Sequence, residues 1–132
     1  MANGVQGGNT APETRTGYND TGSTIPKGTL VKLKAAESYS EIQPVAAIAD
    51  VVYGVAAADI VDKAYGPVYI RGCCQVLAHA ALTQGGIVTA HSNGRAVNAV
   101  TGGRIVGVAL EIGASGALTE IELSGPGAPL SP

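Results

Sequence analysis

The stretch GGRIVGVALEIGASGALTEIEL, from Gly102 to Leu123, decides the fold class of this chain. Its first part, GRIVGVALEI, is apolar at nearly every position, which predicts a central β-strand buried on both faces. In its last part Ile121 and Leu123 alternate with Glu120 and Glu122, so the apolar side chains are expected to point inward and the carboxylates outward. The stretch therefore predicts two strands of an all-β protein.

A glycine interrupts this apolar run at Gly107, and Gly54 does the same in DVVYGVAAADI. Glycine is unfavourable in a strand unless another backbone must come close or the strand must bend. We therefore predict that Gly54 and Gly107 are structural glycines, placed where strands kink and cross. A small closed barrel and a tight sandwich both need such corners, and the sequence leaves the two open.

Three short blocks of the first half return in the same order in the second half. Two halves of a sheet built on a related plan would give this pattern, and so would convergence between unrelated meanders. The blocks are GTLV from Gly28 and GGIV from Gly85, VVYGVA from Val51 and RIVGVA from Arg104, and GPVYI from Gly66 and GALTEI from Gly116.

The rest of the chain also favours strands over helices. Strands are predicted at residues 29–34 and 51–58. Another covers GPVYIRG and continues through CQVLAH after a turn or bulge at Gly72. One short helical turn, at residues 46–50, is the most that we expect. The fold class is all-β, as a compact small barrel or sandwich with an extended N-terminal arm.

The pair Asn93–Gly94 is the clearest local signal, because both residues tolerate the positive φ angles of a tight hairpin turn. A two-residue turn at this position pairs Ala90 with Val97 and Val88 with Ala99. These four apolar side chains would then share one face of a half-buried hairpin.

Three segments are expected in the chain of 132 residues. Residues 1–24 are polar and lack periodicity, which predicts an extended arm that does not bury enough apolar area to fold alone. Residues 25–124 form the β-rich domain. Residues 125–132 are rich in Pro and Gly and predict an extended tail.

The composition argues against two classes of partner. The net charge is −2 and no basic patch is visible, so we expect no direct contact with nucleic acid. No apolar run is long enough to cross a bilayer, and the N-terminus lacks the pattern of a signal peptide. We therefore expect no membrane contact and a cytoplasmic site of synthesis.

The chemistry-bearing residues are few. Cys73 and Cys74 are adjacent, so we expect two reduced thiols, one on each face of a strand. Zinc sites space their cysteines by two to four residues, and His79 and His91 do not complete such a pattern. The chain is expected not to be an enzyme and to hold no metal and no cofactor.

The order of the blocks resembles the small capsid decoration, or cement, proteins of tailed bacteriophages, including head-fibre-like ones. The resemblance covers residues 20–125 and lies in IPKGTLVKL, VYGVAAADI, GPVYIRG and GGRIVGVALEIGASGALTEIELSG. It implies a structural virion protein on the outer surface of the capsid. Such a protein would stabilise the expanded head by clamping neighbouring major capsid subunits.

The resemblance also implies a homotrimer at three-fold or quasi-three-fold positions, and an N-terminal arm that lies on the shell. An arm with open backbone groups can add a strand to the edge of another sheet. The contact positions that we select within the arm are Val5, Thr10, Thr16 and Tyr18.

Two other interpretations of the function remain open. A β-rich module on a fibre, binding carbohydrate or a host surface, would need an exposed aromatic platform, and the five tyrosines are too scattered along the chain to indicate one. A lipoyl-type carrier domain would present a modified lysine at a hairpin tip, whereas Lys32 and Lys34 fall within a predicted strand.

Overall fold

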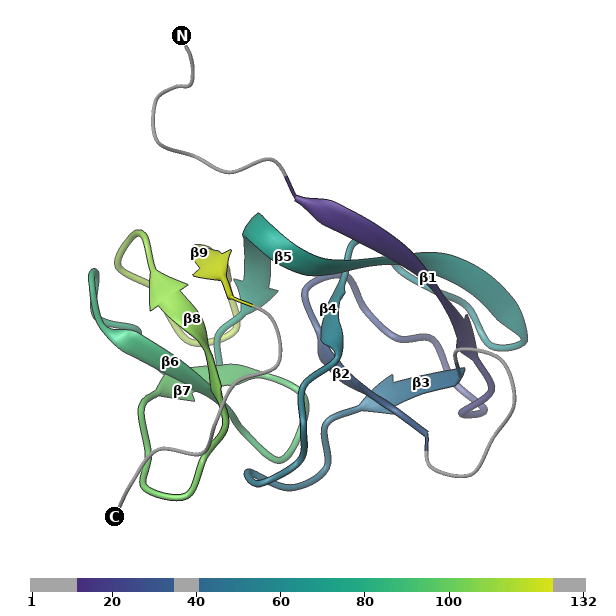
Figure 1. Cartoon of the computed structure of the whole chain (residues 1–132), viewed down its shortest axis with the longest axis horizontal. Helices are drawn as coiled ribbons and strands as arrows, with labels where there is room; N and C mark the ends of the chain where they lie inside the picture. The colour runs from purple at the N-terminus through teal and green to yellow at the C-terminus, as the bar shows by residue number, and fades with distance from the viewer. Residues whose placement is uncertain (1–11, 35–40, 125–132) are drawn as a thin grey trace, which may run out of the picture.

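A computed structural model describes residues 12–34 and 41–124, and these residues form nine strands and no helix. The prediction of an all-β fold is confirmed. Figure 1 shows two lobes joined by one long strand, β5. The strands are β1 (Glu13–Asn19), β2 (Leu30–Leu33), β3 (Glu41–Pro44), β4 (Gly54–Ala56), β5 (Ala64–Leu77), β6 (Ile87–Ala90), β7 (Ala96–Asn98), β8 (Ile105–Ala109) and β9 (Leu118–Leu123).

The first lobe is a closed ring of five strands, in the order β1-β3-β2-β4-β5. The first part of β5 pairs with β4 on one side and with β1 on the other, and β1 also pairs with β3 in parallel. The pairing of β1 with both neighbours closes the ring. This lobe is therefore a small barrel rather than a sandwich, and we call it the first ring.

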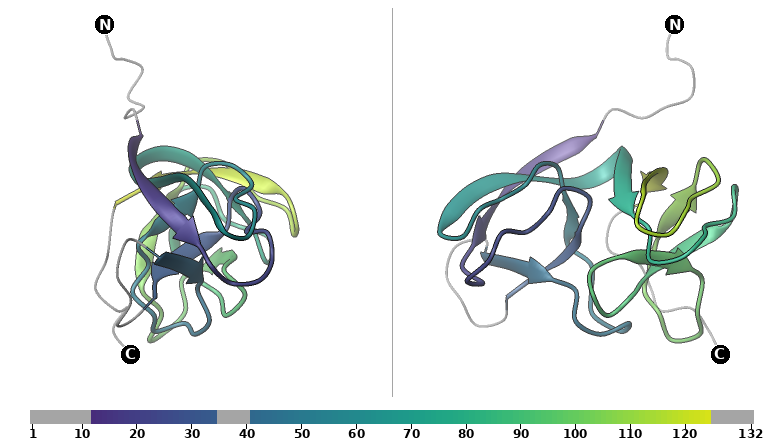
Figure 2. Two further views of the ribbon diagram at one scale, coloured as in Figure 1. Left: turned by 90° about the vertical axis from the view of Figure 1, so that its right-hand side faces the viewer. Right: turned by 180° about the vertical axis from the view of Figure 1, so that it is seen from behind.

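The second lobe follows the order β5-β9-β8-β6-β7, beginning with the last part of β5. A parallel bridge between Ala78, directly after β5, and Ala96 of β7 brings the last strand back to the first. We call this lobe the second ring. Gly72 lies where β5 passes from one ring to the other, and its φ of 100° suits glycine alone. The views in Figure 2 show the same two lobes on either side of β5.

The two rings share one plan down to their register. In the first ring Val55 of β4 lies opposite Tyr69 of β5, and in the second Val108 of β8 lies opposite Glu122 of β9. The β2–β3 and β2–β4 pairings correspond in the same way to β6–β7 and β6–β8. The repeated sequence blocks therefore mark two structurally equivalent halves. The third block needs a correction, because this register matches Val68 to Ile121 rather than Gly66 to Gly116.

One pair of equivalent positions exchanges a large and a small side chain. In the first ring, a Cβ atom at Gly66 would collide with Ile60. In the second ring Gly113 stands at the position of Ile60, and a Cβ atom there would collide with Thr119, which stands at the position of Gly66. Each ring thus has one glycine and one larger residue at this contact, and the larger side chain fills the space beside the glycine.

Two clusters of buried side chains hold the rings together. Alternate residues of β2 and β4 point to different clusters, so that Val31 and Ala56 fill the first ring while Leu30 and Val55 pack against the second. The rings therefore share a packed interface. The first cluster comprises Ile25, Val31, Ile42, Ala56, Ile60 and Val68.

The structural role of Gly54 and Gly107 follows from the neighbouring backbone. A Cβ atom at Gly107 would lie well inside 3.0 Å of the carbonyl oxygen of Glu122, and one at Gly54 would do the same at the carbonyl oxygen of Tyr69. The two glycines occupy equivalent positions in the two rings. Each lets an adjacent strand approach more closely than any other residue would permit.

The hairpin around Asn93 and Gly94 differs from the prediction. The structure pairs Ala90 with Ala96 and Thr89 with Val97, one residue away from the predicted register. The backbone N–H of Gly94 donates to the carbonyl of His91 (3.1 Å), and Gly94 has a φ of 76°. This is a type I turn followed by a left-handed residue, which makes a three-residue loop. As a result Ala96, not Val97, lies in the core.

The apolar run around Gly107 is only partly as predicted. β8 lies between β6 and β9, but Val108 is 39% exposed, so the strand is not buried on both faces. The outer face of this sheet has no covering layer among the described residues. The alternation in β9 is confirmed, because Ile121 and Leu123 are buried.

Part of the predicted arm belongs to the first ring. Residues 13–19 form β1, which pairs with β5 along its whole length. The first four residues of β1 are exposed. Backbone hydrogen bonds to β5, rather than an apolar face, therefore hold this part of the strand in place. Residues 1–11 and 125–132 lie outside the described part of the chain. Within that part, no helix has the length and apolar character needed to cross a membrane.

Candidate interaction surface

The four predicted contact positions divide between two regions. Val5 and Thr10 lie outside the described residues. Thr16 and Tyr18 lie on β1, where Thr16 is exposed and Tyr18 is half-buried. Contact of these residues with a capsid remains a prediction, but Thr16 and Tyr18 would make it from a strand of the first ring.

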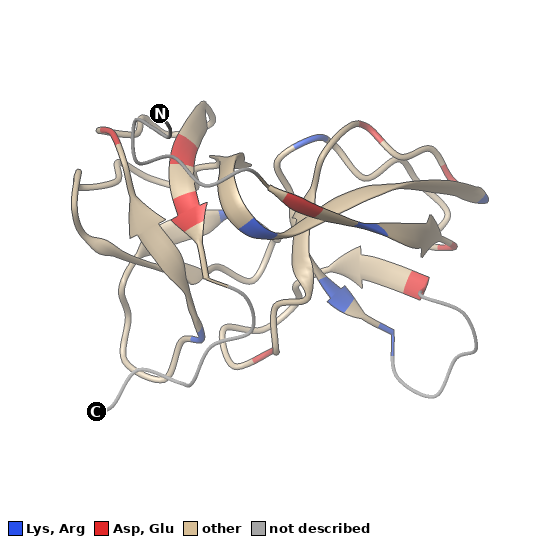
Figure 3. Ribbon diagram, turned by 45° about the horizontal axis from the view of Figure 1, so that its top comes forward, with Lys and Arg blue, Asp and Glu red and all other residues tan. Residues whose placement is uncertain are grey.

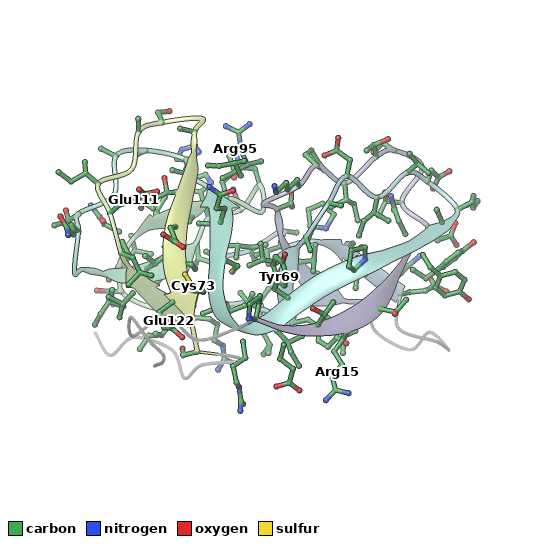
Figure 4. All side chains as sticks on the ribbon, turned by 90° about the horizontal axis from the view of Figure 1, so that it is seen from above. Arg15, Tyr69, Cys73, Arg95, Glu111 and Glu122 are labelled. Carbon is green, nitrogen blue, oxygen red and sulfur yellow. The ribbon has the colours of Figure 1, made fainter. Side chains whose placement is uncertain are left out.

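The surface over β1 is open and lightly charged. Arg15 and Glu13 form an ion pair of 3.3 Å, with side chains 59% and 46% exposed. Exposed pairs of this kind contribute little to stability, so both groups are free to exchange partners. Figure 4 shows Arg15 projecting away from the strand.

The end of β1 carries an aromatic pair that joins two strands. Tyr18 and Tyr65 lie opposite each other in the β1–β5 register, with ring centroids 4.8 Å apart and planes tilted by 48°. Tyr65 is 62% exposed. A flat platform for a sugar needs coplanar rings, and the rings of this pair are tilted. Tyr53 and Tyr69 instead pack against the core clusters.

Asn19 fixes the end of β1 to the following turn. Its side chain is fully buried, and its Nδ2 donates to the carbonyls of Ser23 (2.8 Å) and Ile60 (2.7 Å). Its Oδ1 accepts hydrogen bonds from the backbone N–H and the hydroxyl of Thr21 (3.0 and 2.7 Å). No sequence pattern indicates this role, because the partners of Asn19 lie in a turn and in a distant loop.

A charged pair lies beside this turn. The hydrogen bond from Lys63 lowers the pKa of Asp20 below its usual value and raises the pKa of Lys63. Lys63 has a left-handed backbone with a φ of 63°, whereas the second ring has Gly116 at the equivalent position with a φ of 79°. The first ring thus keeps a lysine where glycine would be the unstrained choice.

Asp50 organises the turn between β3 and β4. Its Oδ2 accepts the backbone N–H groups of Ala46 and Ala47 (3.0 and 2.9 Å) and lies 3.0 Å from the Nζ of Lys32. Burial alone would raise the pKa of Asp50, but these partners together lower it below its usual value. The sequence predicted at most a short helical turn at residues 46–50; the structure has a hydrogen-bonded turn there, with no helix, and Asp50 caps it.

We expect Asp50→Asn to lower the free energy of unfolding by about 1 kcal/mol at pH 7. A lowered folded-state pKa means that the carboxylate stabilises the fold above the unfolded value of 3.8. That stabilisation is lost as the pH falls through the folded value. Denaturant unfolding between pH 7 and pH 2 should show the two proteins converging below pH 3.8. Parallel curves over this range would contradict the assignment.

The outer face of the second ring is acidic. Glu120 and Glu122 lie on β9, and Figure 3 shows acidic positions in red on this lobe, while Lys and Arg are scattered over both lobes. Cys73 of β5 lies beside the carboxylates of β9, as Figure 4 shows, and its thiol donates a hydrogen bond to Oε2 of Glu120 (2.7 Å). Burial and this hydrogen bond raise the pKa of Cys73 to about 12. Cys73 and Cys74 are both free thiols, as expected.

The raised pKa makes Cys73 a slow nucleophile at pH 8, because the thiolate is the reactive form. Glu120→Gln removes the acceptor carboxylate and should speed alkylation of Cys73 by iodoacetamide by roughly tenfold. Glu122→Gln is the matched control, because Glu122 lies opposite Cys73 without accepting its proton. Mass spectrometry of the intact protein over time gives the rates. Equal acceleration by both variants would show that general negative charge, not the hydrogen bond, protects the thiol.

The two histidines meet at the end of the second ring. The rings of His79 and His91 stack with centroids 3.7 Å apart and planes 11° apart. The side chain of Asn93 lies within 3.4 Å of the Nδ1 atoms of both. This contact ties the hairpin loop to the end of β5. Within the described residues, no group of three His, Cys, Asp or Glu side chains is placed to hold a metal ion.

The molecule is thus an all-β protein of two equivalent five-stranded rings that share one strand. Among solved structures, it is similar to the crystal structure of the N base of head fibre gp8.5 in bacteriophage phi29. The TM-score is 0.68 and the sequences are 22% identical, over 89% of this chain and 98% of that chain. The likeness shows a shared fold. No family model matches the chain, and the search of curated proteins found no match.

Proposed function

We propose that this chain is a structural protein of a bacteriophage head. The observation that supports the proposal is the fold shared with a head-fibre base over 98% of that chain. The repeated sequence blocks, which resemble phage decoration proteins, point to the same class.

In the finer form of the proposal, the chain binds the outer surface of the expanded head and clamps neighbouring major capsid subunits. A ligand that binds one state of a lattice stabilises that state by its binding free energy. Many copies would add modest contributions into a strong reinforcement. The role needs no reaction and no cofactor, and a homotrimer at three-fold or quasi-three-fold positions would suit it.

The first test is co-sedimentation. Heads are pelleted from the source lysate, and mass spectrometry measures the ratio of this chain to the shell protein. We expect a fixed ratio near one to one or a simple fraction of it. A chain that stays soluble while intact heads pellet would overturn the proposal.

A second test addresses the contact surface. Thr16→Arg places a bulky charge on the exposed face of β1, and Thr101→Arg places the same charge on an exposed turn of the second ring. We expect only the first to reduce co-sedimentation. Equal binding by both variants would remove β1 from the contact while leaving the virion role standing.

A second candidate function is carbohydrate binding through the Tyr18–Tyr65 pair. Tyr65 is 62% exposed, and the charged residues Asp62 and Lys63 precede it by three and two positions in the chain, so a sugar ring could stack on Tyr65. Titration with host-surface polysaccharide, compared between the native chain and Tyr65→Ala, tests this reading. Loss of binding in the variant would support it, and no binding by the native chain would exclude it.

A further inference from the structure

The hairpin loop between β6 and β7 contains an asparagine followed by a glycine, Asn93–Gly94. In such a pair the backbone nitrogen of the glycine can attack the side-chain amide carbon of the asparagine, because glycine has no side chain to hinder the approach. A bond forms from this nitrogen to Cγ, the Cγ–Nδ2 bond breaks, and ammonia leaves with the proton of the backbone N–H. Water then opens the succinimide ring to give aspartate or isoaspartate. The pair is therefore a candidate site of deamidation.

The native loop blocks the first step of this reaction. The backbone N–H of Gly94 donates to the carbonyl of His91 (3.1 Å), so its nitrogen cannot attack while this bond is intact. The carbonyl of Gly94 accepts the N–H of Leu30 on β2 (2.6 Å), and Oδ1 of Asn93 accepts the N–H of Arg95 (3.2 Å). These three hydrogen bonds fix both reacting groups. Cyclisation therefore requires the loop to open.

Two histidine rings hold the loop against the end of β5. His91 belongs to the loop, and its ring stacks on that of His79, with centroids 3.7 Å apart and planes 11° apart. The backbone N–H of His79 donates to the carbonyl of Ala96 on β7 (2.8 Å), which anchors this side of the stack. Nδ1 of His79 also lies 3.4 Å from Nδ2 of Asn93, the atom that the reaction expels. Opening the loop thus means separating the two rings, which we call the histidine pair.

We propose that Asn93 is a deamidation site that the histidine pair protects, so that it is converted only in molecules whose loop has opened. The rate of conversion then follows the population of the open loop. The product also affects the contact between the two rings of the fold. Isoaspartate adds a methylene group to the backbone directly before Gly94, whose carbonyl binds Leu30 of the first ring. This inference does not depend on the proposed role in a phage head.

Peptide mapping by mass spectrometry tests the proposal. The full chain is incubated at mildly alkaline pH for several days, and the conversion of Asn93 to the acid is followed. A synthetic peptide of residues 89–97 gives the rate of the unprotected sequence. We expect the native chain to react at least about tenfold more slowly than the peptide. His79→Ala removes the ring on which His91 stacks, and it should speed the reaction of the full chain roughly fivefold.

His79→Phe is the matched control, because it keeps a flat ring against His91, and its rate should stay close to the native one. Unchanged methyl signals of Ile121 show that each variant is folded; if His79→Ala does not fold, His91→Ala replaces it, with the same acceleration expected. A native chain that reacts as fast as the peptide would overturn the proposal. A folded His79→Ala chain with the native rate would overturn it too, as would a His79→Phe chain that reacts as fast as His79→Ala.

Discussion

Gly107→Ala is expected to destabilise the chain by at least about 3 kcal/mol, a large part of the roughly 5–15 kcal/mol by which native proteins are stable. The new Cβ atom would fall well inside 3.0 Å of the carbonyl oxygen of Glu122, and that oxygen belongs to the backbone of a paired strand. No side-chain rotation relieves the overlap. β8 and β9 would have to separate, and the buried residues between them would lose contacts. Urea unfolding followed by circular dichroism measures the change.

Two further substitutions make this result specific. Gly54→Ala should cost a similar amount, because Gly54 meets the carbonyl of Tyr69 at the equivalent place in the first ring. Gly102→Ala is the control, since Gly102 has a φ of 85° but no heavy atom within 4 Å of the added methyl group. That change should cost about 1 kcal/mol, from backbone strain alone. A Gly107→Ala protein within 1 kcal/mol of the native chain would contradict the close approach of β8 and β9.

Asn19→Ala is expected to lower the free energy of unfolding by about 3 kcal/mol. The change removes four hydrogen bonds from a fully buried side chain and leaves a cavity at the end of β1. Asn19→Asp keeps the acceptor for Thr21 but loses both donors and buries a charge, so it should be no better. Thermal or urea unfolding at pH 7 gives the values.

Asn98→Ala provides the comparison for Asn19. Asn98 is exposed, and its side chain accepts from the N–H of Thr83 (3.0 Å) and donates to the carbonyl of Ala81 (3.3 Å). The solvent can replace these bonds, so we expect a loss of about 1 kcal/mol or less. Equal effects of the two alanine substitutions would show that burial of Asn19 does not matter.

The features that were predicted correctly are those that depend on the order of apolar and polar side chains along the chain. Alternation in β9 placed Ile121 and Leu123 correctly, and glycines within apolar runs marked the close approaches at Gly54 and Gly107. The repeated blocks pointed to two related halves, although they could not show that the register is shared. The choice between barrel and sandwich depends on which strands meet at the edges, and that information is not local.

Other features depended on backbone pairing or on distant partners. β1 is mostly polar and lacks the apolar alternation by which strands are recognised, so the sequence predicts an extended arm at these residues. Asn–Gly suits both a two-residue and a three-residue hairpin loop, and only the burial of Ala96 decides between them. The contact of Tyr18 with Tyr65 joins strands far apart in sequence, and a hollow in the surface of the first ring is lined by two separate segments, Lys32 with Leu33 and Asp50 with Val51 and Tyr53.

The shared strand β5 makes the unfolding of the two rings one event. Its first part completes the first ring and its last part begins the second, so neither ring keeps all five strands if the other is removed. Leu30 and Val55 also pack across the boundary. We therefore expect a single cooperative transition, with equal calorimetric and van't Hoff enthalpies, despite the two-lobed shape. Two separate transitions would mean that each ring is a domain in its own right, with β5 acting only as a linker.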